Sequence, residues 1–279
     1  MTLAGLSGSG KSLICEEFKR DFVDLNPDDK FDILSFEFEM HSKDQVARNL
    51  SGKLGMSTKY LYSGEDNFIK DDEFEHIENV AMSLRRYPIY YVDDFGSVDE
   101  IRDTVLDFVD RQDLLSRDRG LVVTIDHVLL TKGKQAEAEK KVIDTLSHMC
   151  VELKKKLTSM GLRVMIILLS QLNRNIETPD RVMNNMLHYP TKNDIFGASS
   201  LFQASDYVLV THKPAVVDGI GEYYGPPRAS FPKGLPVYTP EDEERAMVYW
   251  HLLKERFGKP KVLMMVDYFE QSSCKEYNL

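Results

Sequence analysis

The chain has 279 residues and 42% hydrophobic side chains, which suits one large α/β domain or two small ones. Its formal net charge of −10 argues against a surface coated with basic residues for nucleic acid, although 35 lysines and arginines still allow a local basic channel. The three cysteines lack metal-ligand spacing, which suggests a reducing compartment. Neither a signal peptide nor an apolar run long enough to cross a bilayer is visible, so we expect a cytoplasmic protein without a membrane partner.

A complete phosphate-binding loop of the pattern GxxxxGKS runs from Gly5 to Ser12. The apolar residues 2–4 predict the end of a strand before it, and residues 12–22 predict a helix after it, as this motif requires. Glycines let backbone N–H groups approach phosphate oxygens, Lys11 can reach the β- and γ-phosphates, and the Ser12 hydroxyl can ligate Mg²⁺. The loop therefore predicts a nucleoside triphosphate, taken as ATP, with Mg²⁺. The residues expected to hold the nucleotide are Gly5, Ser7, Gly8, Ser9, Gly10, Lys11, Ser12 and Leu13.

Candidate strands and helices alternate along the chain, which predicts a mostly parallel central sheet flanked by helices, with antiparallel strands at the C-terminal end. Ser42 is expected to cap a helix. The predicted strands are residues 31–38, 89–92, 121–125, 163–169, 207–211, 245–253 and 262–269. The predicted helices are residues 12–22, 45–54, 71–86, 98–109 and 135–157.

The organisation of the chain predicts a single domain over residues 1–279, because no internal repeat or low-complexity tract is visible. The segment 213–240 is rich in Gly, Pro and Tyr, and we expect an extended surface loop there since strands resume after it. Only four residues precede Gly5, although a phosphate-binding loop normally follows a full buried strand. Either that strand is very short or the chain is a piece of a longer protein, and we expect the second.

Polar residues suited to ATP hydrolysis follow several predicted strands. Such a site needs a second Mg²⁺ ligand and a group that orients the attacking water. Asp93 and Asp94 follow one strand and Asp126 follows another, so by pattern alone either strand could supply the metal ligand. Glu39 is a further candidate, because ligands gather at the carboxyl ends of strands in open α/β sheets. Gln171, after the most apolar strand, could contact a γ-phosphate; for each residue, a solvated or packing role is the alternative.

Three of these segments resemble motifs of the DnaB-type hexameric replicative helicases. Residues 36–40, Phe-Glu-Phe-Glu-Met, are similar to that family's Phe-Ser-Leu-Glu-Met. Residues 126–130, Asp-His-Val-Leu-Leu, are similar to its Asp-Tyr-Leu-Gln-Leu. Residues 169–174 are identical to a third motif of the family, Leu-Ser-Gln-Leu-Asn-Arg.

Later motifs extend the resemblance in the same order. Residues 193–195 with Gln203 and Asp206 follow the family's Ser-Asp-Leu…Gln…Asp pattern, and residues 254–258 are similar to its Lys-Gln-Arg-Asn-Gly. The resemblance implies a RecA-like P-loop ATPase domain with an α/β fold. The family's N-terminal domain and connecting helix have no counterpart here.

The resemblance implies a role for each candidate residue. It assigns the metal to Asp126 and leaves Asp93 and Asp94 at the end of a neighbouring strand. It implies that Glu39 polarises the attacking water and that Gln171 reports the γ-phosphate. Two C-terminal cations would act in the next subunit's site as an arginine finger and its companion, because the transferring phosphoryl group needs cations. The implied catalytic residues are Lys11, Glu39, Gln171, Lys254 and Arg256, and the implied metal ligands are Ser12 and Asp126.

The family's DNA-contacting loop corresponds to residues 194–200, where this chain departs from the pattern. The family has an arginine where this chain has Phe196, and glutamates where it has Gly197 and Phe202. Backbone amides can still bind single-stranded DNA there, and Phe196 could stack on a base or pack in the core. The residues expected to bind DNA are Asn173, Arg174, Phe196, Gly197 and Ser199.

These features predict the motor domain of a replicative helicase of a bacterium or phage, which hydrolyses ATP and moves on single-stranded DNA as a homohexameric ring. A primase or a helicase loader is a candidate partner. One alternative is another RecA-like DNA-dependent ATPase, such as a strand-exchange recombinase, which would form a filament on DNA. A second alternative is a nucleotide-gated scaffold subunit with little turnover, which a DNA-stimulated ATPase rate would distinguish.

Overall fold

A computed structural model describes residues 1–62, 69–94, 96–128, 131 and 139–277, which form two compact units. The first unit comprises Met1–Lys11, Leu169–Asp267 and Cys274–Leu279, and the second comprises Ser12–Leu168 and Tyr268–Ser273. The single domain inferred from the sequence stays a prediction. Leu129, Leu130 and residues 135–138, which belong to a predicted motif and a predicted helix, lie outside the described residues.

The second unit contains parallel strands in the spatial order β5-β4-β2-β3. More than half of the residues in β4 and in β2 are apolar, because both faces of these strands are covered. The strands β2 and β4 end in register, with Glu37 opposite Asp126. The strand bounds are β2 Phe31–Glu37, β3 Ile89–Val92, β4 Gly120–Asp126 and β5 Val164–Gln171, whose last three residues belong to the first unit.

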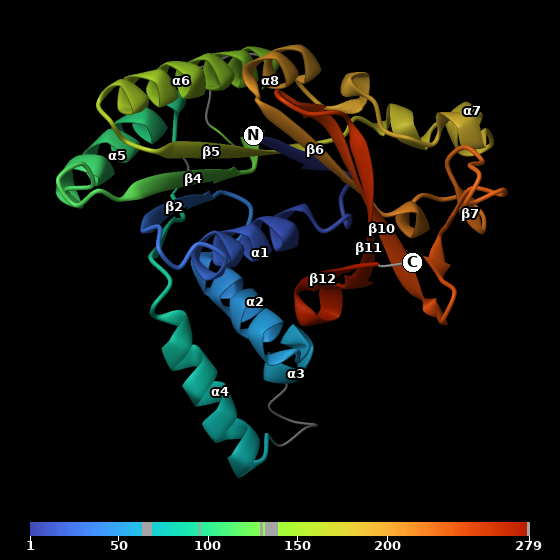
Figure 1. Cartoon of the computed structure of the whole chain (residues 1–279), viewed down its shortest axis with the longest axis horizontal. Helices are drawn as coiled ribbons and strands as arrows, with labels where there is room; N and C mark the ends of the chain where they lie inside the picture. The colour runs from blue at the N-terminus through green and yellow to red at the C-terminus, as the bar shows by residue number, and fades with distance from the viewer. Residues whose placement is uncertain (63–68, 95, 129–130, 132–138, 278–279) are drawn as a thin grey trace. The chain divides into compact units, whose positions relative to one another are not determined.

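Helices cover both faces of these strands: α5 and α6 lie on one face, and α1 and α2 lie on the other (Figure 1). The sequence explains where α5 begins: Ser97 caps the helix, and its hydroxyl accepts the Glu100 N–H at 3.3 Å. Ile101, Val105 and Val109 then recur at helical spacing and are buried. The helix bounds are α1 Lys11–Asp24, α2 Ser42–Leu54, α3 Thr58–Tyr62, α4 Asp71–Leu84, α5 Val98–Arg111 and α6 Glu139–Ser159.

The first unit contains strands in the order β12-β11-β10-β6-β1. The strand β6 pairs parallel with β1 and antiparallel with β10, and β10 pairs antiparallel with β11. The predicted α/β fold with antiparallel C-terminal strands is therefore confirmed. The bounds are β1 Thr2–Gly5, β6 Tyr207–His212, β10 Asp242–Glu255, β11 Lys261–Tyr268 and β12 Ser273–Glu276.

The segment 213–240 differs from the extended surface loop that we predicted. Tyr224, Leu235 and Val237 are buried, because this segment packs on β10. The Met247 N–H donates to the Val237 carbonyl at 2.9 Å, and the Tyr249 hydroxyl donates to the Pro236 carbonyl. Its short elements are the 3₁₀ helix η5 Pro214–Val216 and the strands β7 Tyr223–Tyr224, β8 Leu235–Pro236 and β9 Tyr238–Thr239.

The remaining short elements connect the strands. They are the helices α7 Pro179–Val182 and α8 Ala198–Ala204 and the 3₁₀ helices η2 Arg174–Glu177, η3 Asn185–Leu187, η4 Lys192–Asp194 and η6 Phe269–Gln271. Among the helices that the structure describes, none has the length and apolar character needed to span a membrane.

Candidate nucleotide and catalytic site

The phosphate-binding loop follows β1 as a tight turn of the first unit. Gly8 and Gly10 have φ values of 76° and 84°. Residues with a side chain rarely adopt such backbone angles, so these positions require glycine. The Ser9 N–H donates to the Leu6 carbonyl at 3.2 Å, and the Thr211 hydroxyl of β6 donates to the Ser9 carbonyl at 2.8 Å. These bonds fix the loop to the sheet and leave its backbone open at the exposed Gly8.

Lys11 extends back across the loop that precedes it. Its side chain is buried, and its ammonium donates to the Leu6 carbonyl at 3.0 Å. An ammonium group is a strong hydrogen-bond donor to phosphate oxygens, which suits the role predicted for Lys11. This geometry suits a phosphate-binding loop whose lysine contacts the phosphates of a nucleoside triphosphate.

Asp126 lies at the end of β4 in the second unit, and its carboxylate receives a hydrogen bond from the Ser12 side chain. Burial, and then the carboxylate of Glu37, raise the pKa of Asp126 to about 7, although Ser12 lowers it. The Oδ1 atom of Asp126 is buried and has no hydrogen-bond partner among the described residues. A buried carboxylate oxygen without a partner, beside a hydroxyl, fits the oxygen ligands that Mg²⁺ prefers.

A complete protein cage for a metal is absent from the described part of the chain, where no group of three or more His, Cys, Asp or Glu could hold an ion. Mg²⁺ commonly keeps one or two protein oxygens and takes the others from water and from substrate phosphates. The pair Ser12 and Asp126 is therefore compatible with a metal that arrives with a nucleotide.

Asp93, the alternative metal ligand, has a different role in the structure. Its carboxylate accepts the Ser42 N–H at 3.0 Å and the Ser42 hydroxyl at 2.8 Å. The predicted cap at Ser42 is therefore wrong: α2 begins at Ser42 itself, His41 precedes it, and the acceptor for the first N–H comes from Asp93. The helix dipole stabilises a carboxylate at a helix N-terminus, so the Asp93 carboxylate is already engaged in binding the N-terminus of α2.

Glu39 lies two residues beyond the end of β2 and is exposed. The segment that carries it is held to β4, because the Phe38 N–H donates to the Asp126 carbonyl at 2.6 Å. Glu39 also contributes to the raised pKa of Asp126, after burial and Glu37. The second unit thus brings the carboxylates of Glu39 and Asp126 to the same edge of the sheet.

Gln171 ends β5, and the first unit links it to the phosphate-binding loop. The Leu172 N–H, next along the chain, donates to the Gly5 carbonyl at 3.2 Å. The Gln171 carbonyl accepts the Phe196 N–H at 2.9 Å, and the Asn173 N–H donates to the Asp194 carbonyl at 2.7 Å. A short backbone path therefore joins the loop, Gln171 and the segment predicted to contact DNA.

The residues predicted to bind DNA lie around that segment. The side chain of Asn173 donates to the Asn193 carbonyl at 2.8 Å, and its oxygen accepts the Asn175 N–H at 3.1 Å. Gly197 has a φ of 71° and precedes α8. Arg174 and Ser199 are exposed, whereas Phe196 is half-buried and its stacking role stays a prediction.

The predicted finger residues lie at the end of β10 and bind to their own chain. The Lys254 ammonium donates to the Phe202 carbonyl at 2.7 Å. The Arg256 guanidinium forms an ion pair with Asp206 at 2.9 Å, and its side chain is 57% exposed. Their action in a neighbouring subunit stays a prediction.

One ion pair and one buried ion cluster were missed by the sequence reasoning. The part-buried Arg181 pairs at 2.5 Å with Asp194, the first residue of the predicted DNA segment. In the second unit, Lys19 forms ion pairs with Glu16 and Glu37. The signal for the second cluster was available, since Glu37 is a charged residue at the end of a mostly apolar strand and Glu16 precedes Lys19 at helical spacing.

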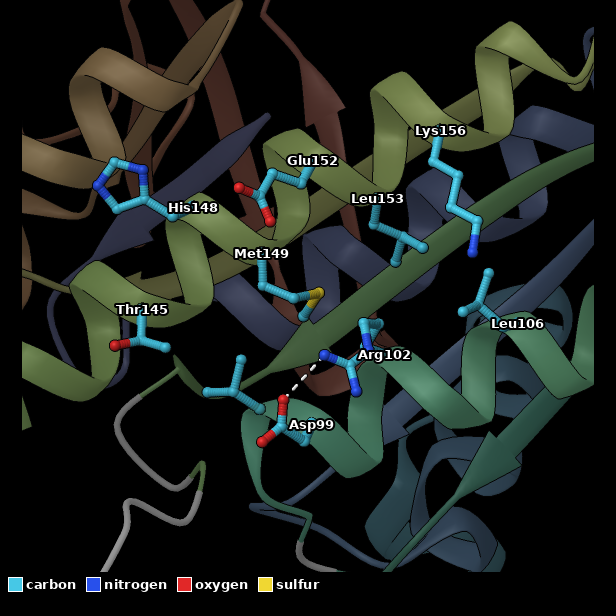
Figure 2. A pocket seen from close by; sticks show the side chains of 10 residues that line it. Asp99, Arg102, Leu106, Thr145, His148, Met149, Glu152, Leu153 and Lys156 are labelled. Atoms are coloured by element: carbon cyan, nitrogen blue, oxygen red, sulfur yellow. Dashed lines mark hydrogen bonds and ion pairs between the residues drawn. The ribbon is translucent and has the colours of Figure 1, made fainter.

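A groove of about 570 Å³ lies between α5 and α6 and carries none of the predicted site residues. Figure 2 shows Met149 and Leu153 at its base and the Arg102–Asp99 ion pair, 2.9 Å long, on its α5 side.

Comparison with known proteins agrees with the motifs. The family model described as "DnaB-like helicase C terminal domain" matches residues 1–261. A "Probable replicative DNA helicase" of Guillardia theta is 30% identical over 178 residues, which cover 63% of this chain and 27% of that protein. The chain thus spans little more than a quarter of this relative's length.

Solved structures of low identity share the fold. One that is described as an ATPase domain aligns with a TM-score of 0.74 at 17% identity, over 99% of this chain and 84% of that one. A DnaB-like replicative helicase described with its interactions with primase aligns with a TM-score of 0.74 at 17% identity, over 99% of this chain and 58% of that one. A KaiC-like protein of Pyrococcus horikoshii aligns with a TM-score of 0.51 at 14% identity, over 99% of this chain and 88% of that one. At these identities, the structures show the fold alone.

Proposed function

Because the chain belongs to the DnaB-like helicase C-terminal domain family, we propose that it is the motor domain of a replicative helicase that hydrolyses ATP to move along single-stranded DNA. The family match over residues 1–261 is the observation that carries this proposal. We further propose that the working form is a homohexameric ring, in which each nucleotide lies between two subunits.

Binding of ATP is assigned to the loop from Gly5 to Leu13. Its N–H groups and the Lys11 ammonium would receive the phosphates, and Ser12 and Asp126 would hold Mg²⁺. When bound, Mg²⁺ neutralises charge on the β- and γ-phosphate oxygens. The unpartnered Oδ1 of Asp126 and its raised pKa support this assignment, since a cation would compensate a buried carboxylate.

Hydrolysis is assigned to Glu39 and Gln171. An exposed carboxylate at the end of β2 can accept a hydrogen bond from water and orient it for attack on the γ-phosphate. Gln171 would contact the γ-phosphate. A shift of Gln171 on phosphate binding would move Phe196 and Asp194, which are hydrogen-bonded to the backbone of residues 171–173. Lys254 and Arg256 would stabilise the transition state in the neighbouring subunit.

The DNA and protein partners that we propose are supported by the same family membership. We propose that single-stranded DNA contacts the backbone of residues 194–200 together with Asn173 and Arg174. A primase or a helicase loader is proposed as a partner, and one structural neighbour is described with its interactions with primase.

Two substitutions test the assignment by separating binding from turnover. Lys11→Ala should abolish tight ATP binding, because the phosphates lose their main protein cation. Glu39→Gln should keep ATP binding and lose turnover, because only water activation is removed. Binding is measured by calorimetry with a non-hydrolysable analogue, and turnover by phosphate release. Equal losses of affinity in both variants would exclude Glu39 as the water-orienting residue.

A further inference from the structure

A charged cluster is buried between α1, α2 and β2, outside the residues assigned above. Lys19 of α1 is almost completely buried, and its ammonium donates to the carboxylates of Glu16 and Glu37 and to the Ser35 hydroxyl. The Lys19–Glu37 distance is 2.7 Å. Burial alone would lower the pKa of Lys19, but the two carboxylates raise it well above its ordinary value. Lys19 therefore keeps its positive charge in the folded protein although it is buried.

Glu37 is the member of the cluster that reaches the candidate active site. It is the last residue of β2 and pairs in register with Asp126 of β4. One of its carboxylate oxygens accepts from Lys19 and Ser35, and the other accepts from Gln45 of α2 at 2.7 Å. Three elements thus converge on one carboxylate, two residues before Glu39.

Stability alone is a weak reason for such a cluster. Removing charges from water costs several kcal/mol per ion, and replacing a buried ion pair by apolar residues is often neutral or stabilising. A salt bridge instead fixes distance and direction, because both charges lose their partners if the elements shift. The similar motif of the helicase family has a serine where this chain has Glu37. The cluster therefore calls for a geometric explanation in this chain.

We propose that Lys19 and Glu37 are positioning residues, which tie the helix after the phosphate-binding loop to the strand end that presents Glu39. The helix α1 begins at Lys11, so Lys19 lies about two turns along it. The other side of the Glu39 segment is held by the Phe38 N–H, which donates to the Asp126 carbonyl at 2.6 Å. Glu39 is thus carried on a segment fixed from α1 through Glu37 and from β4 through Phe38. The inference rests on the proposed role of Glu39.

The principal test replaces Glu37 by glutamine, which keeps the shape of the side chain and leaves Lys19 paired with Glu16. The variant Glu37→Gln should lower kcat for ATP hydrolysis at least about tenfold and change KM for ATP less than about twofold, because Glu39 is misplaced while the loop is intact. A merely structural role would lower the melting temperature without this division between kcat and KM.

The matched control lies at the other end of the same strand. Asp32 is a buried carboxylate of β2 that pairs with Arg119 at 2.7 Å, far along the strand from Glu39. Asp32→Asn should lower stability and leave kcat within about twofold of the unchanged protein. If Asp32→Asn lowers kcat as much as Glu37→Gln does, the effect is general to β2 and the proposal is wrong.

Glu39→Gln, measured in parallel, distinguishes this inference from the proposed function. If Glu39→Gln loses turnover and Glu37→Gln retains it, only the positioning role fails. If Glu39→Gln retains turnover, the role of Glu39 fails, and the positioning role that depends on it fails with it.

A second variant and a second readout keep the test decisive if Glu37→Gln does not fold. Glu37→Ser replaces the carboxylate by a smaller side chain. Hydrogen exchange measures directly how firmly the backbone N–H groups of residues 38–40 are held. Faster exchange at Phe38 in the folded variant, with unchanged exchange in Asp32→Asn, is the expected result. If neither Glu37 variant folds, the cluster serves folding and the positioning role is rejected.

Discussion

Arg256 is bound to Asp206 of its own chain by two contacts. Its guanidinium pairs with the Asp206 carboxylate at 2.9 Å, and its backbone N–H donates to the Asp206 carbonyl at 3.0 Å. Exposed ion pairs contribute only about 0–1 kcal/mol, so the guanidinium can exchange Asp206 for a phosphate at little cost. The backbone contact would meanwhile keep the strand end in place.

If Arg256 acts on the neighbouring subunit, subunits with Arg256→Ala should inhibit the ATPase activity of the wild-type subunits with which they assemble. Each variant subunit disables the site of its neighbour and interrupts the ring, so ATPase activity should fall more steeply than the fraction of variant added. The measurement is steady-state hydrolysis across a series of mixtures at constant total protein. A linear decline would mean that Arg256 serves its own subunit or none, and Lys154→Ala, an exposed helix position, provides the mixing control.

DNA affinity should depend on Phe196 if a base stacks on its half-buried ring. Phe196→Ala should then weaken binding of oligo-dT by about 1–3 kcal/mol, measured by fluorescence anisotropy. The salt dependence should stay unchanged, because no phosphate contact is lost. Unchanged affinity in a folded variant would place Phe196 in the core.

Assembly of this chain should be linked to nucleotide. If Lys254 and Arg256 complete a site on the next subunit, the nucleotide bridges two subunits and stabilises the oligomer by mass action. Sedimentation at micromolar protein should give larger species with a non-hydrolysable ATP analogue and single-stranded DNA than without them. A stable hexamer under both conditions would contradict this, because the interface would then be built from other surfaces.

Acid should destabilise the first unit through its buried histidines. Burial, followed by the charges of His188 and Arg181, lowers the pKa of His212 to about 3. Burial also lowers the pKa of His251 well below its ordinary value. The unfolded chain therefore binds more protons between about pH 6.5 and 3, so the free energy of unfolding falls as the pH falls through this window.

For His212, the expected loss is about 2 kcal/mol in the free energy of unfolding between pH 7 and 5 by linkage. Urea unfolding at the two pH values measures it. His212→Gln should flatten the dependence, whereas His76→Gln, at an exposed position of α4, should leave it unchanged. Equal pH dependence in both variants would contradict the assignment to His212.

Most of the fold could be predicted from local patterns. The loop from Gly5 to Ser12 has a fixed spacing, and the apolar strands are bounded by polar residues, so β3 was predicted at its exact bounds and β4 within one residue at each end. These features depend on neighbours in the chain, which a sequence shows directly.

The features that were missed depend on partners distant in the chain. Ser42 has the residue type of a cap, but the acceptor is Asp93, which β3 brings to the helix. Segment 213–240 has turn residues throughout, yet Tyr224 is buried because β10 offers a surface for it. Glu37 was read as part of a motif, whereas its role is set by Lys19 and Gln45, which only the fold brings to it.

The rate of ATP hydrolysis with and without oligo-dT tests the central proposal most directly. We predict that the chain hydrolyses ATP, that single-stranded DNA increases kcat several-fold, and that Glu39→Gln abolishes both rates while retaining bound nucleotide. A chain that binds ATP but turns it over at the same negligible rate with and without DNA would contradict the account of a DNA-driven motor domain.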